Sequence, residues 1–161
     1  MGLLRRTRWD AQPTQQAGVL LASDGRDDFS SGAVATAAAL GDQSSTKSVA
    51  VIAIAKVYGF SYGLPHPGLM PTKAEAMERT GWVQSAIETL KKSGLASDGQ
   101  VATTRHGVKM IAKIAQQRNV SHIVVDGTKA TGIRRMIEGD VGDELNRRLR
   151  GKNIQVVVIQ P

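Results

Sequence analysis

Short apolar runs alternate with helix-forming segments along most of this chain, and this alternation restricts its fold more than any other feature. The expected strands are residues 18–23, 48–58, 100–106, 121–126 and 153–160. Apolar residues at helical spacing indicate helices over residues 29–40, 73–92, 107–119 and 140–151. Strands that alternate with helices form parallel sheets through right-handed crossovers. The sequence therefore predicts an α/β fold, a doubly wound five-stranded parallel sheet with helices on both faces.

Two boundaries and one connection depend on local signals. The side chain of Asp28 or Ser30 could cap the first helix, and Gly41 is expected to end that helix. The 100–106 segment has the weakest strand pattern. The 59–72 connection is rich in Gly and Pro and longer than most, which indicates either a functional flap or a disordered loop.

The composition is that of an ordinary globular protein. The 161 residues are enough for one domain with a sizeable core and too few for two. The absence of cysteine excludes disulfides and thiol chemistry and agrees with a cytoplasmic location. No apolar stretch approaches the roughly 20 residues of a membrane span. We expect a flexible basic arm at residues 1–16 and a single domain over residues 17–161.

The net charge of +7 could indicate a nucleic-acid partner or simply a basic surface. Aromatic residues are sparse, and no recognition-helix or stacking motif is found, so nucleic acid is not the expected partner. The arm contains Arg5, Arg6, Arg8 and Trp9, and it could instead dock a protein partner.

Two of the expected strands end in loops suited to a shared ligand site. The first strand ends at Asp24-Gly25 and the fourth at Asp126-Gly127. In open α/β sheets the ligand crevice lies beyond the carboxyl ends of the strands, where the strand order reverses. We expect that reversal to bring the two loops side by side.

The loop after the fourth strand has the composition of a phosphate cradle. GTKATG, residues 127–132, offers two glycines and several small residues, and Lys129 could reach an anion. Gly139 and Asp140 open the next helix, whose first amides would point toward the same space.

At these residues the chain resembles the universal stress protein family. The resemblance extends from Gly18 to Ile159 and depends on LLASDG (20–25), VVDG (124–127), TGIRRMIEGDV (131–141) and VVVI (156–159). It implies an adenine nucleotide alpha hydrolase-like fold, with ATP or AMP as a bound nucleotide and Mg only alongside that nucleotide. The site residues that it implies are Ala22, Ser23, Asp24, Ile54, Asp126, Gly127, Lys129, Ala130, Gly132, Gly139, Asp140 and Val141.

The phosphate loop departs from the pattern of the nucleotide-binding members. Ala130 replaces the middle glycine, and eight residues instead of nine separate it from Gly139. Asp140 replaces a Ser or Thr whose hydroxyl would donate to a phosphate oxygen, whereas an ionised carboxylate only accepts. Asp140 should cap its helix as well as serine does. Lys129 and the Arg134-Arg135 pair could compensate in part, so we predict weakened or altered nucleotide binding.

The residues suggest no efficient enzyme. No Ser/His/Asp arrangement, acid–base pair or GxxxxGK[ST] loop is found. The function expected from the resemblance is that of a regulatory or binding module. One alternative is a genuine ATP/AMP-binding stress protein with at most slow hydrolysis, using a metal at Asp126 or Asp140. Another is a partner-docking subunit without a small-molecule ligand.

A homodimer is expected from the resemblance and from the last strand. Its residues form a flat apolar edge: Gln155, Val156, Val157, Val158 and Ile159. An exposed edge of this kind tends to be paired or covered, and a second copy of the chain could pair with it.

Overall fold

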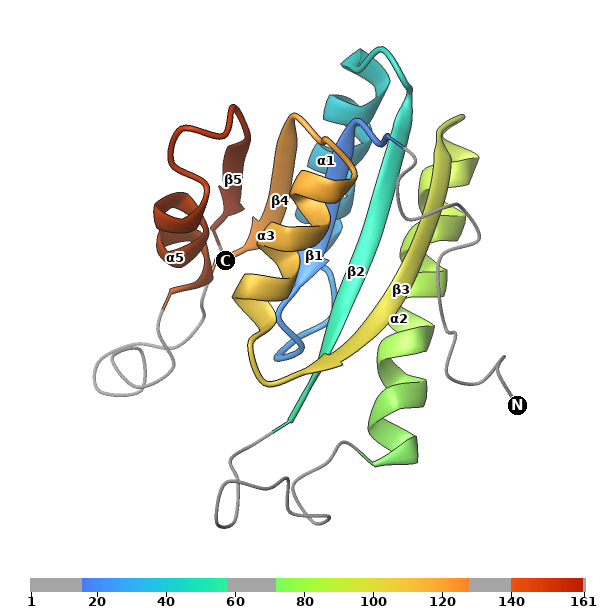
Figure 1. The fold of residues 1–161 in the computed structure, drawn as a ribbon. Helices are drawn as coiled ribbons and strands as arrows, with labels where there is room; N and C mark the ends of the chain where they lie inside the picture. Colours follow the sequence, from blue (N-terminus) through green and yellow to red (C-terminus); the bar gives the residue numbers. More distant parts are fainter. Residues whose placement is uncertain (1–15, 58–71, 128–139, 161) are drawn as a thin grey trace.

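The computed structural model describes residues 16–57, 72–127 and 140–160, and within them the predicted alternation is confirmed. Figure 1 shows the elements in chain order. They are β1 (Val19–Ser23), α1 (Ser31–Gln43), β2 (Ser48–Lys56), α2 (Lys73–Lys92), β3 (Ala96–Thr104), α3 (Gly107–Gln117), β4 (His122–Asp126), α5 (Val141–Arg148) and β5 (Gln155–Ile159).

The five strands form one parallel sheet in the order β3-β2-β1-β4-β5. The chain moves outward from β1 to β3, then crosses back to place β4 on the other side of β1. Every residue of β1 is buried, as expected for the central strand of a sheet covered on both faces. The strand order therefore reverses between β1 and β4, and the predicted neighbourhood of their two loops is confirmed.

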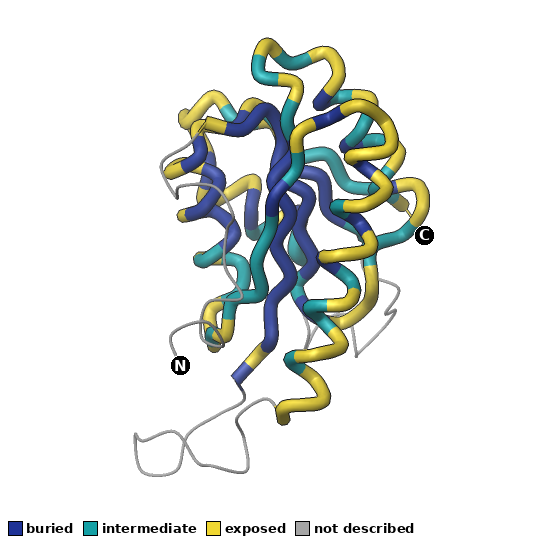
Figure 2. Tube along the Cα trace, turned by 90° about the vertical axis from the view of Figure 1, so that its right-hand side faces the viewer, coloured by how far each residue is buried: buried dark blue, intermediate teal, exposed yellow. Residues whose placement is uncertain are grey.

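Helices cover both faces of the sheet (Figure 1), which confirms the doubly wound architecture. One apolar layer joins α3 and α5 to the sheet and includes Ile111 and Leu145, both fully buried. The other joins α1 and α2 to the opposite face and includes Ala37 and Leu90. Figure 2 shows buried residues following the strands and exposed residues along the outer sides of the helices.

The first helix begins as predicted but ends later. Ser30 is its N-cap, and the Ser30 hydroxyl accepts a hydrogen bond from the amide of Ala33 at 3.0 Å. The prediction that Gly41 ends the helix was wrong, because α1 continues to Gln43. A Cβ on Gly41 would lie 2.6 Å from Cγ2 of Val49, so glycine is needed here for close packing of the helix on β2.

The third strand begins at Ala96, four residues before the predicted start. Its first half is poor in β-forming residues, but β2 pairs with it over its full length. A Cβ on Gly99 would lie 2.6 Å from Cγ1 of Val83, so this glycine admits α2 close to the sheet. Asp98 is held by the buried side chain of Arg118, with Nη2 to Oδ2 at 3.0 Å.

Several predictions lie outside the described residues. They concern the arm up to residue 15, most of the 59–72 connection and the loop at 128–139. Thr72, the last residue of that connection, caps α2 by accepting a hydrogen bond from the amide of Glu75 at 3.0 Å. Among the helices of the described ranges, none is long and apolar enough to cross a membrane.

Candidate functional site

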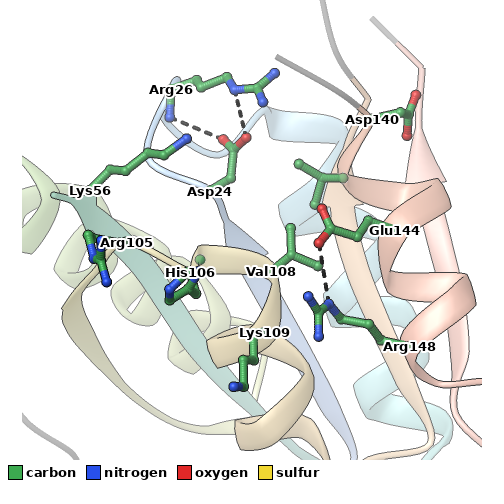
Figure 3. A pocket seen from close by; sticks show the side chains of 12 residues that line it. Asp24, Arg26, Lys56, Arg105, His106, Val108, Lys109, Asp140, Glu144 and Arg148 are labelled. Carbon is green, nitrogen blue, oxygen red and sulfur yellow. Dashed lines mark hydrogen bonds and ion pairs between the residues drawn. The ribbon is translucent and has the colours of Figure 1, made fainter. Parts of the chain in front are cut away.

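A cleft of about 150 Å³ lies beyond the carboxyl ends of the strands, where α3 and α5 begin (Figure 3). Its walls combine charged side chains with two valines. The lining residues are Asp24, Arg26, Lys56, Arg105, His106, Gly107, Val108, Lys109, Asp140, Val141, Glu144 and Arg148. Three of the residues predicted for the ligand site, Asp24, Asp140 and Val141, are among them.

The loop after β1 holds Asp24 against the cleft. One carboxylate oxygen of Asp24 accepts a hydrogen bond from the Arg26 amide at 3.1 Å, and the other lies 2.9 Å from Nε of Arg26. The buried Ser23 hydroxyl braces the same turn by donating to the Asp27 carbonyl at 2.8 Å. Gly25 has φ of +94°, and a Cβ there would overlap the Ile54 carbonyl oxygen. The turn therefore requires glycine and presents Asp24 in a defined position.

A residue of α2 secures this loop from the other side. Nη2 of Arg79 donates a hydrogen bond to the carbonyl oxygen of Gly25 at 2.6 Å. The same guanidinium lies 4.7 Å from the centre of the Trp82 ring, a cation–π distance. Nothing in the sequence pattern of α2 indicated this role, because the contact joins residues 54 positions apart.

The opposite end of the cleft is formed by the start of α5. Asp140 is the N-cap, and its Oδ1 accepts a hydrogen bond from the Asp143 amide at 3.2 Å. This confirms the prediction that Asp140 caps this helix. One turn further, Nε of Arg148 lies 3.3 Å from a carboxylate oxygen of Glu144. Acidic groups therefore gather at this end of the cleft.

A third wall of the cleft was missed by the sequence analysis and is mainly cationic. Lys56 ends β2, Arg105 and His106 connect β3 to α3, and Lys109 lies in the first turn of α3. All four lie at the carboxyl edge of the sheet, the edge already predicted for ligand binding. Because ligands bind beyond the carboxyl ends of parallel strands, the residues that end the second and third strands could also have been predicted as site residues.

Charge in the cleft is positive overall. Five cationic and three acidic side chains are found among the described lining residues, so the formal charge is +2 with His106 neutral. Two of the acids are each paired with an arginine of the same wall, Asp24 with Arg26 and Glu144 with Arg148. Such a site attracts anions, although exposure to water weakens the attraction.

Other predicted site residues are not among the described residues that line the cleft. Asp126 accepts hydrogen bonds from the amide of Ser30 at 3.0 Å and from its hydroxyl at 2.5 Å. Ala22 and Ile54 are buried in the core, with exposures of 2% and 0%. The amide of Gly127 donates to the Ile159 carbonyl at 2.7 Å.

The remaining points concern four predicted site residues and the possibility of a metal site. Four residues lie outside the described part of the chain: Lys129, Ala130, Gly132 and Gly139. Among residues 16–57, 72–127 and 140–160, no group of three or more His, Asp or Glu side chains could hold a metal ion.

Comparison with known proteins identifies similar folds but no similar sequences. No protein-family model matches the chain, and no curated protein matches it. Universal stress protein UspA from Lactobacillus plantarum has a TM-score of 0.66 at 14% identity, over 90% of this chain and 98% of its own. The universal stress protein from Archaeoglobus fulgidus in complex with dAMP has a TM-score of 0.58 at 17% identity, over 89% and 97%.

A third solved structure, a universal stress protein in complex with cAMP, has a TM-score of 0.56 at 14% identity and covers 91% of this chain and 98% of its own. The three similarities extend over nearly the whole domain on both sides of the comparison. The chain therefore has the fold of these universal stress proteins, as the sequence resemblance implied.

Proposed function

We propose that this protein is a regulatory or binding module whose cleft takes an adenine nucleotide with a short phosphate group, and that triphosphates bind weakly. The observation that carries the proposal is the carboxylate of Asp140, which lines the cleft at the N-terminus of α5. Two proteins of the same fold are complexes with dAMP and cAMP, which supports a nucleotide with a single phosphate as the ligand.

Electrostatics supports selection against a long phosphate chain. Two like charges about 4 Å apart repel by about 1 kcal/mol in water and by several times more in a partly dehydrated cleft. A triphosphate carries more negative charge than a monophosphate, so Asp140 and Glu144, which line the cleft, repel it more strongly. The net positive charge of the walls still favours a small anion over a neutral ligand.

The size and polarity of the cleft agree with a short ligand. A volume of about 150 Å³ is well below the roughly 300–1,000 Å³ of typical small-molecule pockets, which favours the shorter of two nucleotides. Asp24 is an acceptor only and suits the hydroxyl groups of a ribose. Val108 and Val141 supply the apolar surface of the lining, which suits an aromatic base.

Calorimetric titration of the full chain with AMP, ATP and GMP tests this function. We expect AMP to bind more tightly than ATP because of the acidic groups at α5. We expect AMP to bind more tightly than GMP because the two solved complexes of this fold hold adenine nucleotides. An affinity for ATP above that for AMP, or no binding of any adenine nucleotide, would overturn the proposal.

A homodimer through β5 is part of the same proposal. β5 is the last strand of the sheet order, and Val156, Val157, Val158 and Ile159 are only partly buried within the single chain. Pairing with a second copy would cover this edge. Protein docking through the 1–16 arm and a cytoplasmic location stay predictions.

A further inference from the structure

We infer that the cleft holds the phosphate group of its ligand at the α3 side, by Lys56, Arg105 and Lys109, and not at the N-terminus of α5. This inference rests on the proposed function, since it names the part of that site which takes the anion. Figure 3 shows Lys56, Arg105, His106 and Lys109 on one side of the cleft and Asp140, Glu144 and Arg148 on the other.

The charges on the two sides differ in sign. Lys56, Arg105 and Lys109 come from three segments of the chain, the end of β2, the connection after β3 and the first turn of α3. Among the described lining residues on the α5 side, the one cation, Arg148, is paired with Glu144 at 3.3 Å, and Asp140 is a second acid. An anion in the cleft is therefore drawn toward α3 and repelled from α5.

The first turns of the two helices strengthen this difference. The first turn of α5 contains Asp143 and Glu144 besides the capping Asp140, whereas the first turn of α3 contains no acidic residue. In the described structure, the side chain of His106 makes no capping hydrogen bond to α3. The partial positive charge of the α3 amides therefore adds to that of the three cations.

Close packing brings the start of α3 to the cleft wall. A Cβ on Gly107 would lie 3.3 Å from Cγ2 of Ile54, a tighter contact than most side chains make. Glycine at this position thus lets the first turn of α3 lie directly on the end of β2, beside Lys56. The cations of the wall are thereby gathered around one backbone segment.

The chemical class that fits this arrangement is a phosphate monoester of a nucleoside or sugar. Lysine and arginine bind a compact dianion through charge-assisted hydrogen bonds, and the fork of an arginine can engage two oxygens. The hydroxyl groups of the same ligand can donate to Asp24, across the cleft from Lys109. A ligand held this way places its phosphate as far as the cleft allows from Asp140.

Binding of AMP to charge-neutralised variants tests the inference. We expect the double variant Arg105→Gln, Lys109→Gln to bind AMP about tenfold more weakly or worse, since two charge-assisted contacts are lost. Lys113→Gln is the matched control, because Lys113 is an exposed lysine one turn further along α3 that does not line the cleft. It should change the affinity by less than about twofold. Equal affinities of the double variant and the control would overturn the inference.

Backbone amide spectra locate the anion directly. In the full chain labelled with ¹⁵N, inorganic phosphate and AMP should each shift the resonances of Gly107 and Val108 at the start of α3. Phosphate-dependent shifts confined to Val141 and Gly142, or no shift at either helix, would overturn the inference. If phosphate shifts α3 but AMP binds no better than phosphate, the proposed adenine function fails while the phosphate site stands. If AMP binds tightly without shifting α3, the function stands and this inference fails.

Discussion

Ser30 donates two hydrogen bonds to Asp126, one from its amide and one from its hydroxyl, across 96 positions of the chain. The same hydroxyl accepts the hydrogen bond that caps α1. The carboxylate at the end of β4 is therefore tied to the start of α1, the helix that covers the opposite face of the sheet from α3 and α5. This relationship explains why Asp126 is not among the described residues that line the cleft.

Replacement of Asp126 by alanine should destabilise the fold and leave AMP affinity nearly unchanged. The Ser30 amide would lose a charge-assisted partner, for a cost of about 1–3 kcal/mol in the free energy of unfolding. Chemical denaturation measures this cost. Asp28→Ala is the control, since Asp28 is exposed and its contact within the described part of the chain is a hydrogen bond from the neighbouring Phe29 amide. A loss of AMP binding in stable Asp126→Ala protein would instead place this carboxylate in the ligand site.

Replacement of Asp140 by serine should tighten ATP binding by about tenfold or more. The change removes a repulsive charge and adds a donor, while the cap of α5 is preserved because serine and aspartate cap helices about equally well. Calorimetry with ATP on both proteins decides the matter. Asp143→Ser is a matched control, since it removes an exposed carboxylate of the same turn that does not line the cleft. An equal gain in both variants would indicate a general charge effect and contradict a specific role of Asp140.

Loss of Asp98 should be among the most damaging single changes in the chain. Its two carboxylate oxygens accept from Nη1 and Nη2 of Arg118 at 3.2 and 3.0 Å, and only 3% of the Arg118 side chain is exposed. Asp98→Ala removes the carboxylate that pairs with this buried guanidinium, so we expect a loss of about 3–5 kcal/mol in the free energy of unfolding. The double variant with Arg118→Met should recover part of that loss. Additive losses in denaturant unfolding would show that the pair is not coupled.

The proposed dimer predicts that a proline at Val156 prevents association. The Gln155 amide donates to the Ser121 carbonyl at 2.9 Å, and the Ile159 carbonyl accepts from Gly127 at 2.7 Å, so both residues face β4. Backbone groups alternate along a strand, which leaves the amides of Val156 and Val158 facing the open edge. Val156→Pro removes one such donor, whereas Val156→Thr keeps it.

Sedimentation of the three proteins tests this prediction. The original chain and Val156→Thr should be dimers, and Val156→Pro should be a monomer with its sheet intact, because proline is tolerated on edge strands. A dimeric Val156→Pro would place the interface elsewhere. If the original chain sediments as a monomer, the proposed dimer is wrong.

The order of the elements and the local caps were determined by the sequence alone. Alternating apolar runs and helical periodicity act over one element at a time, so the five-stranded parallel sheet and the reversal between β1 and β4 could be predicted. The caps at Ser30 and Asp140 follow from contacts within three residues. Asp24 and Asp140 each lie directly beside the end of an element, so their place in the lining of the cleft could be predicted in the same way.

Only the tertiary structure decided which distant residues meet. Gly41 lies inside a helix, where close packing against Val49 leaves no room for a side chain. The third strand begins early because β2 pairs with its first half, which is poor in β-forming residues. Asp126 turns to Ser30 and away from the cleft, although its position in the sequence resembles that of Asp24. The cationic wall of the cleft forms only because the ends of β2 and β3 lie beside the start of α3. Such contacts join segments far apart in the chain, where no local preference acts, so packing and the topology of the sheet determine them.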